Sequence, residues 1–184
     1  MKINESVLQN GDIFFTADNS ILSKAIRYFT KSEVSHCGQL MNTFNDGSFY
    51  RVEMTKDFFG KEDFKVSIPV SLKAKNIVSI KRVNKYCHVY DTEIKRNIFR
   101  ERMLNWHRKQ EFGYDIKELL ANLPIINKLA KDNNKKDKIC SRLVLDNLII
   151  DGMDEIRMSF GELVTPDELY KCPYLVEVEG WKVE

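Results

Sequence analysis

The sequence lacks the long apolar segments that mark membrane and secreted proteins. None of its apolar runs reaches the roughly 18 residues that suggest a membrane-spanning helix. Its first residues, MKINESVLQNG, contain no apolar core of the kind found in a signal peptide. We therefore expect a protein without a transmembrane segment that stays in the cytoplasm.

Cysteine and histidine are scarce, with four residues of the first type and three of the second. The cysteines form no Cys-x-x-Cys pair and stand far apart, at Cys37, Cys87, Cys140 and Cys172. In a reducing compartment such cysteines are expected to be free thiols, of which one or two could be functional. The sequence thus predicts no disulfide framework, no metal and no cofactor.

An excess of charge of one sign is also missing, because 29 basic side chains face 27 acidic ones. Nucleic-acid binding usually shows as a large basic excess, so we expect no nucleic-acid partner. The one lysine-rich stretch, Lys131–Lys138, lacks periodicity and is typical of an exposed loop. The oligomeric state stays open.

The chain has no internal repeat and no linker rich in proline, glycine or serine. Its 184 residues suit one domain, which we expect to span residues 1–184. Strand patterns dominate the first half and helix patterns the second, without regular alternation. This order favours an α+β fold.

Hydrophobic periodicity and turn signals predict the following elements. The expected strands are Ile13–Phe15, Val34–Phe44, Phe49–Met54, Val66–Val70, Ile77–Val83, Leu175–Val178 and Trp181–Val183. Four helices are expected, of which the first begins after Asn19 or Ser20. The second runs from Thr92 to about Gln110, with Ile94, Ile98, Met103 and Trp106 on one face. The third starts near Asp115 and is interrupted by Pro124, and the fourth spans Ile139–Ile150.

A predicted hairpin places one histidine beside one carboxylate. Asp46 and Gly47 separate two apolar-rich runs, which is a strong hairpin signal. The hairpin would hold His36 and Glu53 on adjacent strands. Strand alternation puts Glu53 on the same face as Arg51, and this face is turned either to a cleft or to solvent. If it is turned to solvent, Glu53 is an exposed carboxylate in an ion pair with Arg51.

Cys140 has the most favourable position for a reactive thiol. It stands at the start of a predicted helix, just after the lysine-rich stretch. The helix dipole and nearby cations lower the pKa of a thiol there, and the thiolate is the nucleophilic form. The alternative is a small apolar residue on the buried helix face. His36 likewise has a purely structural alternative.

The order of several short motifs resembles that of the permuted NlpC/P60 (papain-like) cysteine hydrolases of the YaeF/YiiX type. Histidine comes first, the acid second and the cysteine last, whereas ordinary papain-like enzymes begin with the cysteine. The motifs are Gly11–Phe15, Ser35–Gly38, Val52–Glu53, Phe112–Asp115, Cys140–Val144 and Thr165–Leu169. They run through nearly the whole chain.

The resemblance implies a circularly permuted papain-like fold, with an antiparallel sheet packed against helices. It implies a thiol hydrolase that cleaves an amide or ester bond, such as a peptidase or amidase acting on cell-wall peptides. Cys140 would be the nucleophile, His36 the general base and Glu53 the group that orients the imidazole. The oxyanion and substrate-binding positions would be Cys140 through its main-chain N–H, Ser141, Tyr114 and Asp12.

Two positions depart from the family pattern, and three alternative functions stay open. Arg142 replaces the usual glutamate, and Cys37 follows His36 where an apolar residue is usual. Lipid acyl chemistry (an acyltransferase, thioesterase or phospholipase) would suit the aromatic residues, whereas Arg142 is compatible with a non-catalytic binding domain. Zinc bound by the pairs His36–Cys37 and Cys87–His88 is the last alternative. The aromatic residues are Phe14, Phe15, Tyr28, Phe29, Phe58 and Phe59.

Overall fold

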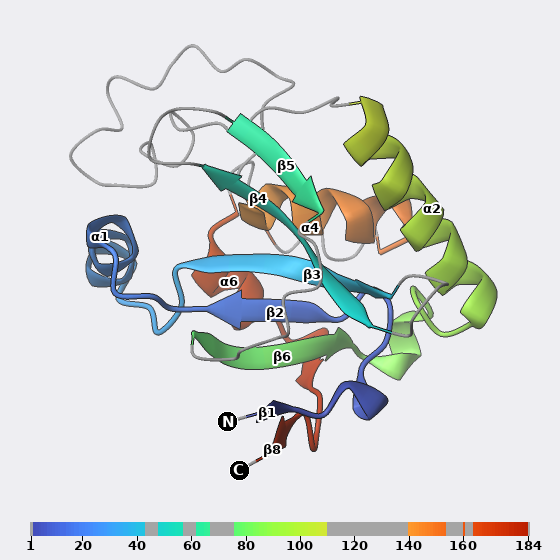
Figure 1. Cartoon of the computed structure of the whole chain (residues 1–184). Coiled ribbons are helices and arrows are strands. Elements are labelled where there is room, and N and C mark those ends of the chain that lie inside the picture. Colours follow the sequence, from blue (N-terminus) through green and yellow to red (C-terminus); the bar gives the residue numbers. More distant parts are fainter. Residues whose placement is uncertain are drawn as a thin grey trace.

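An antiparallel sheet forms the centre of the molecule (Figure 1). The computed structural model describes residues 2–42, 48–56, 62–66, 76–109, 140–153, 160 and 164–183. The sheet has the order β5-β4-β3-β2-β6-β7. Its strands are β2 Ile13–Thr16, β3 His36–Asn42, β4 Phe49–Lys56, β5 Glu62–Val66, β6 Ile77–Val83 and β7 Leu175–Glu177. A separate pair joins β1 Lys2–Ile3 to β8 Lys182–Val183.

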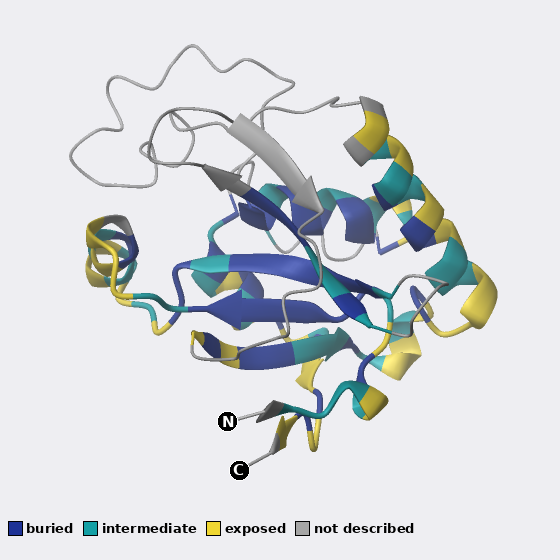
Figure 2. Ribbon diagram, viewed as in Figure 1, coloured by how far each residue is buried: buried dark blue, intermediate teal, exposed yellow. Residues whose placement is uncertain are grey.

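The helices lie around this sheet and leave its middle strands buried (Figure 2). They are α1 Ile21–Thr30, α2 Glu93–Lys109, α4 Cys140–Ile150 and α6 Pro166–Tyr170, with short 3-10 turns at Glu5–Val7 and Lys85–Cys87. Among the described residues, none of the helices combines the length and the apolar character that a membrane crossing needs.

Strand alternation divides the buried side chains into two clusters, one on each face of the sheet. The larger cluster joins Phe15, Cys37 and Val52 to α4 and α2. The smaller cluster contains Phe14 and Leu40, which are one residue from Phe15 and three residues from Cys37 on the same strands and therefore point to the other face. The packing of α4 against β3 brings the first residue of α4 to the strand that carries His36.

Local sequence signals explain where two of the helices begin. The Ser20 side chain accepts a hydrogen bond from the main-chain N–H of Ser23 and so caps α1. Before α6, Thr165 and Glu168 form a reciprocal capping box, and Pro166 occupies the first turn. The start of α1 after Ser20 matches the expectation, whereas no helix was expected at α6 although its capping signals are local.

The observed architecture is mixed α and β with an antiparallel sheet, as expected. β6 has the predicted bounds, Ile77–Val83, and β2 and α4 each lie within one residue of theirs. The strand expected at Val66–Val70 instead runs from Glu62 to Val66, and residues 67–70 lie outside the described part. The predicted turn at 45–47, the helix at 115–124 and the loop at 131–138 also lie outside it.

The face assigned to α2 was wrong. Ile94 and Ile98 are 72% and 56% exposed, whereas Phe99 and Met103 are fully buried. At 100° per residue, Ile94 and Met103 lie on opposite sides of a helix, so they cannot share one face. Helix α2 therefore packs on the core through the side that carries Phe99 and Met103.

Candidate active site

His36 and Glu53 meet at one end of the β3–β4 pair. Gln39 lies opposite Val52 in this pair, so His36 and Glu53 are diagonal neighbours on one face of the sheet. The distance from His36 Nε2 to Glu53 Oε2 is 2.8 Å. Their side chains are 21% and 8% exposed, so the contact is largely shielded from water.

Arg51 holds the same carboxylate oxygen from the other side. Its Nη2 donates to Glu53 Oε2 at 2.7 Å, and its guanidinium carbon lies 4.5 Å from the centre of the Phe14 ring. Burial raises the pKa of Glu53, but the hydrogen bond and charge of His36, and then the charge of Arg51, outweigh it and leave this pKa below its usual value. Glu53 is therefore a carboxylate at neutral pH.

A glycine lets an aromatic ring lie beside this group. Phe14 is opposite Gly38 in the β2–β3 register. A Cβ atom on Gly38 would be 2.6 Å from the Phe14 ring and 2.6 Å from the carbonyl oxygen of Val52. The Phe14 ring thus fills the space of the missing side chain, and its centroid lies 6.3 Å from that of the His36 ring. Close approach of neighbouring groups is the reason for glycine here.

Cys140 begins α4 and is 2% exposed. Its side chain lies close enough to those of Cys37 and His36 for both to shift its pKa. The hydrogen bond from Cys37 lowers the pKa of the Cys140 thiol most, burial opposes it, and the charge of His36 lowers it further, so that this pKa falls well below the ordinary value. The thiolate is the favoured form of Cys140.

The pKa of the His36 imidazole shifts in the opposite direction to that of Cys140. Burial by itself lowers the pKa of His36, but the charge and hydrogen bond of Cys140 and then those of Glu53 raise it to about 10. The pKa of Cys37 also shifts upward, because burial and the neighbouring Cys140 raise it well above the ordinary value. These pKa directions favour a thiolate at Cys140, an imidazolium at His36 and a neutral thiol at Cys37.

Contacts along α4 fix the position of Cys140. The Ser141 hydroxyl donates to the carbonyl oxygen of Val164 at 2.6 Å, in a fully buried setting. One turn and a half later, Asn147 Nδ2 donates to Gln39 Oε1 of β3 at 2.7 Å. Satisfied buried polar contacts of this kind resist displacement, because breaking one leaves a buried group without a partner. The Asn147–Gln39 contact holds α4 in register with β3, and the Ser141–Val164 contact joins α4 to the segment before α6.

The helix is also fixed at its other end. Arg102 of α2 makes two hydrogen bonds to the carboxylate of Asp151, at 2.8 and 2.5 Å. A bidentate arginine–carboxylate pair sets direction as well as distance. On the surface of α4, Arg142 pairs with Asp146 at 3.0 Å, one turn further along. The residue that departs from the family motif is thus engaged within its own helix.

Of the residues singled out from the sequence, the structure brings together His36, Glu53 and Cys140. Ser141 is adjacent, but its hydroxyl is occupied by Val164. Asp12 is 1% exposed and accepts two hydrogen bonds of 2.7 Å from Arg82, at the end of β2 away from His36. Tyr114 and the motif at 112–115 lie outside the described residues.

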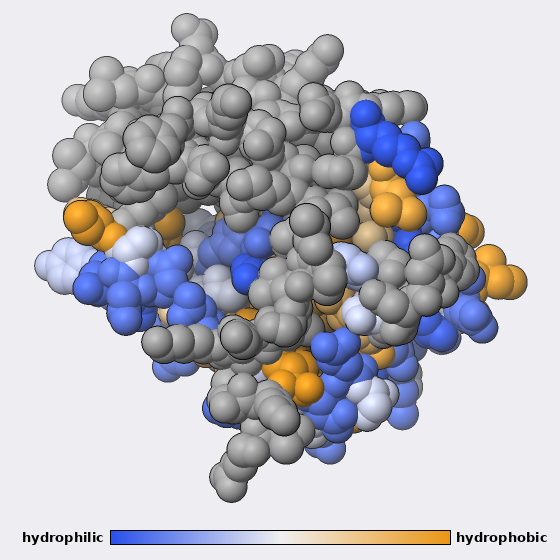
Figure 3. Space-filling model, in the orientation of Figure 1, coloured by the Kyte–Doolittle hydropathy of each residue, from blue (hydrophilic) through white to orange (hydrophobic). Residues whose placement is uncertain are grey.

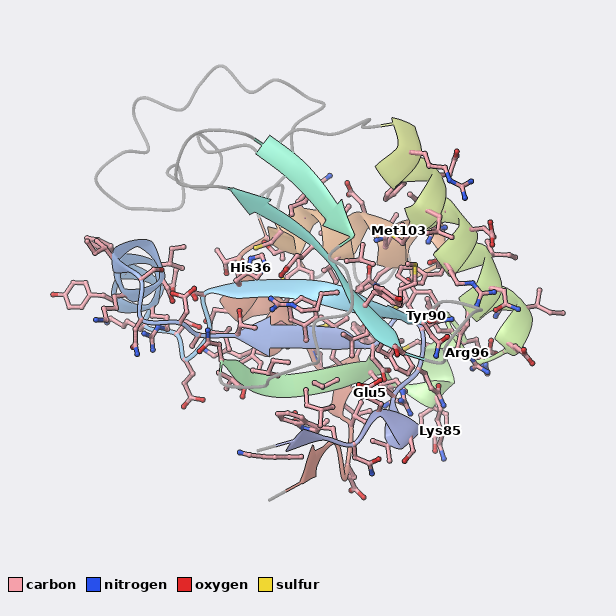
Figure 4. The ribbon with its side chains drawn as sticks, in the orientation of Figure 1. Glu5, His36, Lys85, Tyr90, Arg96 and Met103 are labelled. Atoms are coloured by element: carbon pink, nitrogen blue, oxygen red, sulfur yellow. The ribbon has the colours of Figure 1, made fainter. Side chains whose placement is uncertain are left out.

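The two pairs considered for zinc do not form one site. His88 Nδ1 lies 3.1 Å from Asp91 Oδ2, and the His88 side chain is 73% exposed. In the view with side chains, His36 lies at one side of the sheet, and Lys85 of the 3-10 turn that includes Cys87 lies at the other (Figure 4). Among the described residues, no group of three His, Cys, Asp or Glu side chains could hold a metal ion.

A cavity of about 550 Å³ lies beside Arg82, Tyr90 and Arg96. Tyr90 and Arg96 are at the side of the molecule opposite His36 in the same view (Figure 4). Arg82, which also pairs with the buried Asp12, belongs to the wall of this cavity. The cavity is separate from the group around Cys140.

Sequence reasoning missed the effect of Cys37 on Cys140, whose pKa it lowers. The unusual cysteine after His36 was the available signal, but it does not reveal which neighbour across the fold that side chain will meet. The ion pair of Arg51 with Glu53, stated as an alternative to the contact with His36, is present together with that contact.

Comparison with known proteins extends only to the fold. No protein-family model matches the sequence, and no curated protein matches it. Among solved structures, the chain resembles the crystal structure of metalloprotein yiiX from Escherichia coli O157:H7, with a TM-score of 0.59 and 17% sequence identity. The likeness covers 92% of this chain and 96% of that one. The chain therefore shares the fold of yiiX, the type that the motif order resembles.

Proposed function

We propose that the protein is a thiol hydrolase that cleaves an amide or ester bond through Cys140, His36 and Glu53. The observation that carries the proposal is the closeness of three side chains: Cys140 and His36 each shift the pKa of the other, and His36 Nε2 lies 2.8 Å from Glu53 Oε2. A nucleophile, a base and a group that orients the base are the parts this chemistry requires. The proposal treats residues 1–184 as one permuted papain-like domain.

The first half of the reaction is acylation of the thiolate. Because Glu53 occupies Nε2 of His36, the nitrogen left for the thiol and the substrate is Nδ1. The sulfur of Cys140 attacks the acyl carbon, and the imidazolium gives its proton to the leaving amine or alcohol. The carbon–nitrogen or carbon–oxygen bond breaks, and a thioester on Cys140 remains.

The second half is hydrolysis of the thioester. Neutral His36 takes a proton from water, and the resulting hydroxide attacks the thioester carbon. The acid leaves, and the thiolate–imidazolium pair is restored. The main-chain N–H of Cys140 at the start of α4 would stabilise the oxyanion, because the first N–H groups of a helix have no partner within it. The Ser141 and Asp12 side chains have other partners, so we propose no substrate contact for them.

The similar structure is described as a metalloprotein, which raises the question of a metal here. Three ligands from protein are the usual minimum for a zinc site. Among the described residues, no group of three suitable side chains converges on one point. The proposed mechanism therefore contains no metal step, and a metal analysis of the purified protein tests this directly.

Cell-wall peptides and lipid acyl groups are the two substrate classes left by the sequence. Phe14 and Phe15 are fully buried, so these two residues belong to the core and cannot line an acyl groove. Phe58 and Phe59 lie outside the described residues. The buried pair Phe14 and Phe15 thus gives no preference for lipids, and the amide or ester hydrolase is the proposal to test first.

The test is capture of the acyl-enzyme. p-Nitrophenyl acetate supplies an acyl group with a coloured leaving group, and intact and peptide mass spectrometry locate any acetyl group. We expect one acetyl group on Cys140, a burst of p-nitrophenolate and no labelling after Cys140→Ala. Cys172→Ala is the matched control, because Cys172 is equally buried at 3% exposure and lies outside the site.

Full turnover by Cys140→Ala would show that the nucleophile is assigned wrongly. A folded wild-type protein that takes no acetyl group on any cysteine, from short or long acyl esters, would favour the non-catalytic binding domain. Circular dichroism of each variant ensures that lost labelling does not come from lost folding.

A further inference from the structure

Helix α1 turns an apolar face to solvent. Ile21 is 86% exposed, Tyr28 79% and Phe29 38%, which is a dense set of exposed large apolar side chains for ten residues. Tyr28 and Phe29 pack edge to face, with their ring centroids 5.3 Å apart. In Figure 1 the helix lies at the left edge of the molecule, away from α2, α4 and α6.

The exposed apolar residues form a stripe because of their spacing. Ile21 and Tyr28 are seven residues apart, so they lie on one side of the helix, with Ala25 between them. The side that faces the protein carries other residues, namely Ser23 and Ile26, which are 4% and 7% exposed. The exposed stripe is therefore separate from the face that packs on the core.

Positive charge borders the stripe. Lys24 stands three residues after Ile21 on the helix, and Lys31, three residues after Tyr28, is the C-cap residue just past the end of α1. Both are exposed, and α1 contains no acidic residue. Glu33, the next acidic residue along the chain, acts electrostatically on Tyr170. Figure 3 shows hydrophobic and hydrophilic surface side by side over α1, at the left of the view.

We propose that α1 docks on the surface of an anionic lipid bilayer, with Ile21, Tyr28 and Phe29 entering the headgroup region and Lys24 and Lys31 contacting lipid phosphates. An amphipathic helix with aromatic and aliphatic residues on one side and lysines at its border is the form that lies in a membrane interface. Exposed tyrosine suits this depth, since its ring is apolar and its hydroxyl stays in water.

The charges of Lys24 and Lys31 favour an anionic membrane as the partner of this face of α1. A second copy of the chain would bring Lys24 and Lys31 against the same lysines in a two-fold contact, whereas an anionic membrane neutralises them. Each lysine near such a surface contributes a free energy that corresponds to about a fivefold gain in binding. The apolar side chains add a component that salt does not screen.

Docking would place the candidate active site near the membrane. Ser23 of α1 and Ser35, the residue before His36, have their hydroxyl oxygens 2.6 Å apart, and this contact is buried. The helix is thus joined to the end of β3 that carries His36. The docking proposal does not require the proposed catalysis, because vesicle binding needs no intact Cys140.

The experiment is co-sedimentation of the full chain with vesicles of phosphatidylcholine alone and of phosphatidylcholine with phosphatidylglycerol. We expect binding to the anionic vesicles, weaker binding in high salt and little binding to neutral ones. The double variant Ile21→Ser, Tyr28→Ser should lose at least tenfold in binding. Lys24→Gln with Lys31→Gln should bind anionic vesicles more weakly and remove most of the salt dependence.

The matched control is Ile94→Ser with Ile98→Ser on α2. These isoleucines are also exposed, at 72% and 56%, but on another helix, so binding should not change. The proposal is overturned if the wild type does not bind anionic vesicles, or if the α2 control loses as much as the α1 variant. Self-association of the wild type that the α1 variant abolishes, without vesicle binding, would assign the face to a second copy instead.

Discussion

The pH dependence of Cys140 alkylation tests the electrostatics of the site without knowledge of the substrate. An ordinary thiol with a pKa of about 8.5 is about one per cent ionised at pH 6.5, so its alkylation slows about a hundredfold below its plateau. Cys140 has a pKa well below the ordinary value, and His36 keeps its proton up to about pH 10. We expect the Cys140 rate to stay nearly flat from about pH 9 to about pH 6.5.

Burial alone could slow a thiol, so the comparison needs a cysteine of equal exposure. Cys172 is 3% exposed against 2% for Cys140, and burial raises the pKa of Cys172. Its rate should rise about tenfold per pH unit through neutrality. Peptide mass spectrometry after pulses of iodoacetamide gives both rates from one sample. The ratio of the two rates should therefore increase as the pH falls.

Two variants separate the causes of the lowered thiol pKa. Cys37→Ala removes the hydrogen-bond donor, so the Cys140 profile should move toward higher pH, whereas Cys37→Ser keeps a donor and should move it less. His36→Ala removes the positive charge and should also move the profile upward. The reasoning is refuted if the wild-type Cys140 rate falls in step with that of Cys172, since no thiolate–imidazolium pair then exists.

Two further predictions concern the residues around this pair. Glu53→Gln should reduce the rate of p-nitrophenyl acetate turnover less than His36→Ala, because the base remains when its orienting carboxylate is lost, and the reverse ranking would contradict these roles. Gly38→Ala should lower the free energy of unfolding in urea by about 1–3 kcal/mol, because the new methyl group would lie 2.6 Å from the Phe14 ring and from a main-chain oxygen that the sheet holds in place; an unchanged midpoint would contradict this.

Short-range patterns were enough to predict part of the site. Alternation along β4 and the hairpin signal after β3 together predict that His36 and Glu53 are neighbours, and both patterns depend on residues close in the sequence. Cys140 at the first turn of α4 follows from the change from a polar run to an apolar one. Local propensity and the global fold agree at these positions.

Long-range packing explains what the sequence did not reveal. Asp12 pairs with Arg82, which is seventy residues away, and no local pattern selects that partner. Cys37 meets Cys140 only because α4 packs on β3 in one particular register, which Asn147 and Gln39 help to fix. The apolar side of α2 was misjudged because isoleucines at Ile94 and Ile98 are exposed, and periodicity treats every apolar residue as buried.

The site should also give the folded state a characteristic pH dependence. Between the ordinary pKa values of histidine and cysteine, about 6.5 and 8.5, the unfolded pair carries one proton on the thiol and the folded pair one proton on His36, so stability should not change with pH. Above about 8.5 the unfolded pair loses its proton and the folded one keeps it until about pH 10. Stability should then fall by up to about 1.4 kcal/mol per pH unit.

In acid, stability should fall as the pH decreases. Below about pH 6.5 the unfolded pair binds a second proton, whereas the folded pair does not bind one until the pH reaches the lowered pKa of Cys140. Stability contributed by the pair should therefore decline on both sides of a flat region. Urea unfolding of the wild type and of the double variant His36→Ala, Cys140→Ala across the same pH range measures this contribution, together with the pKa shifts that the pair imposes on Glu53 and Cys37. Parallel curves would mean that the two side chains do not exchange a proton on folding, and the thiolate–imidazolium pair would have to be abandoned.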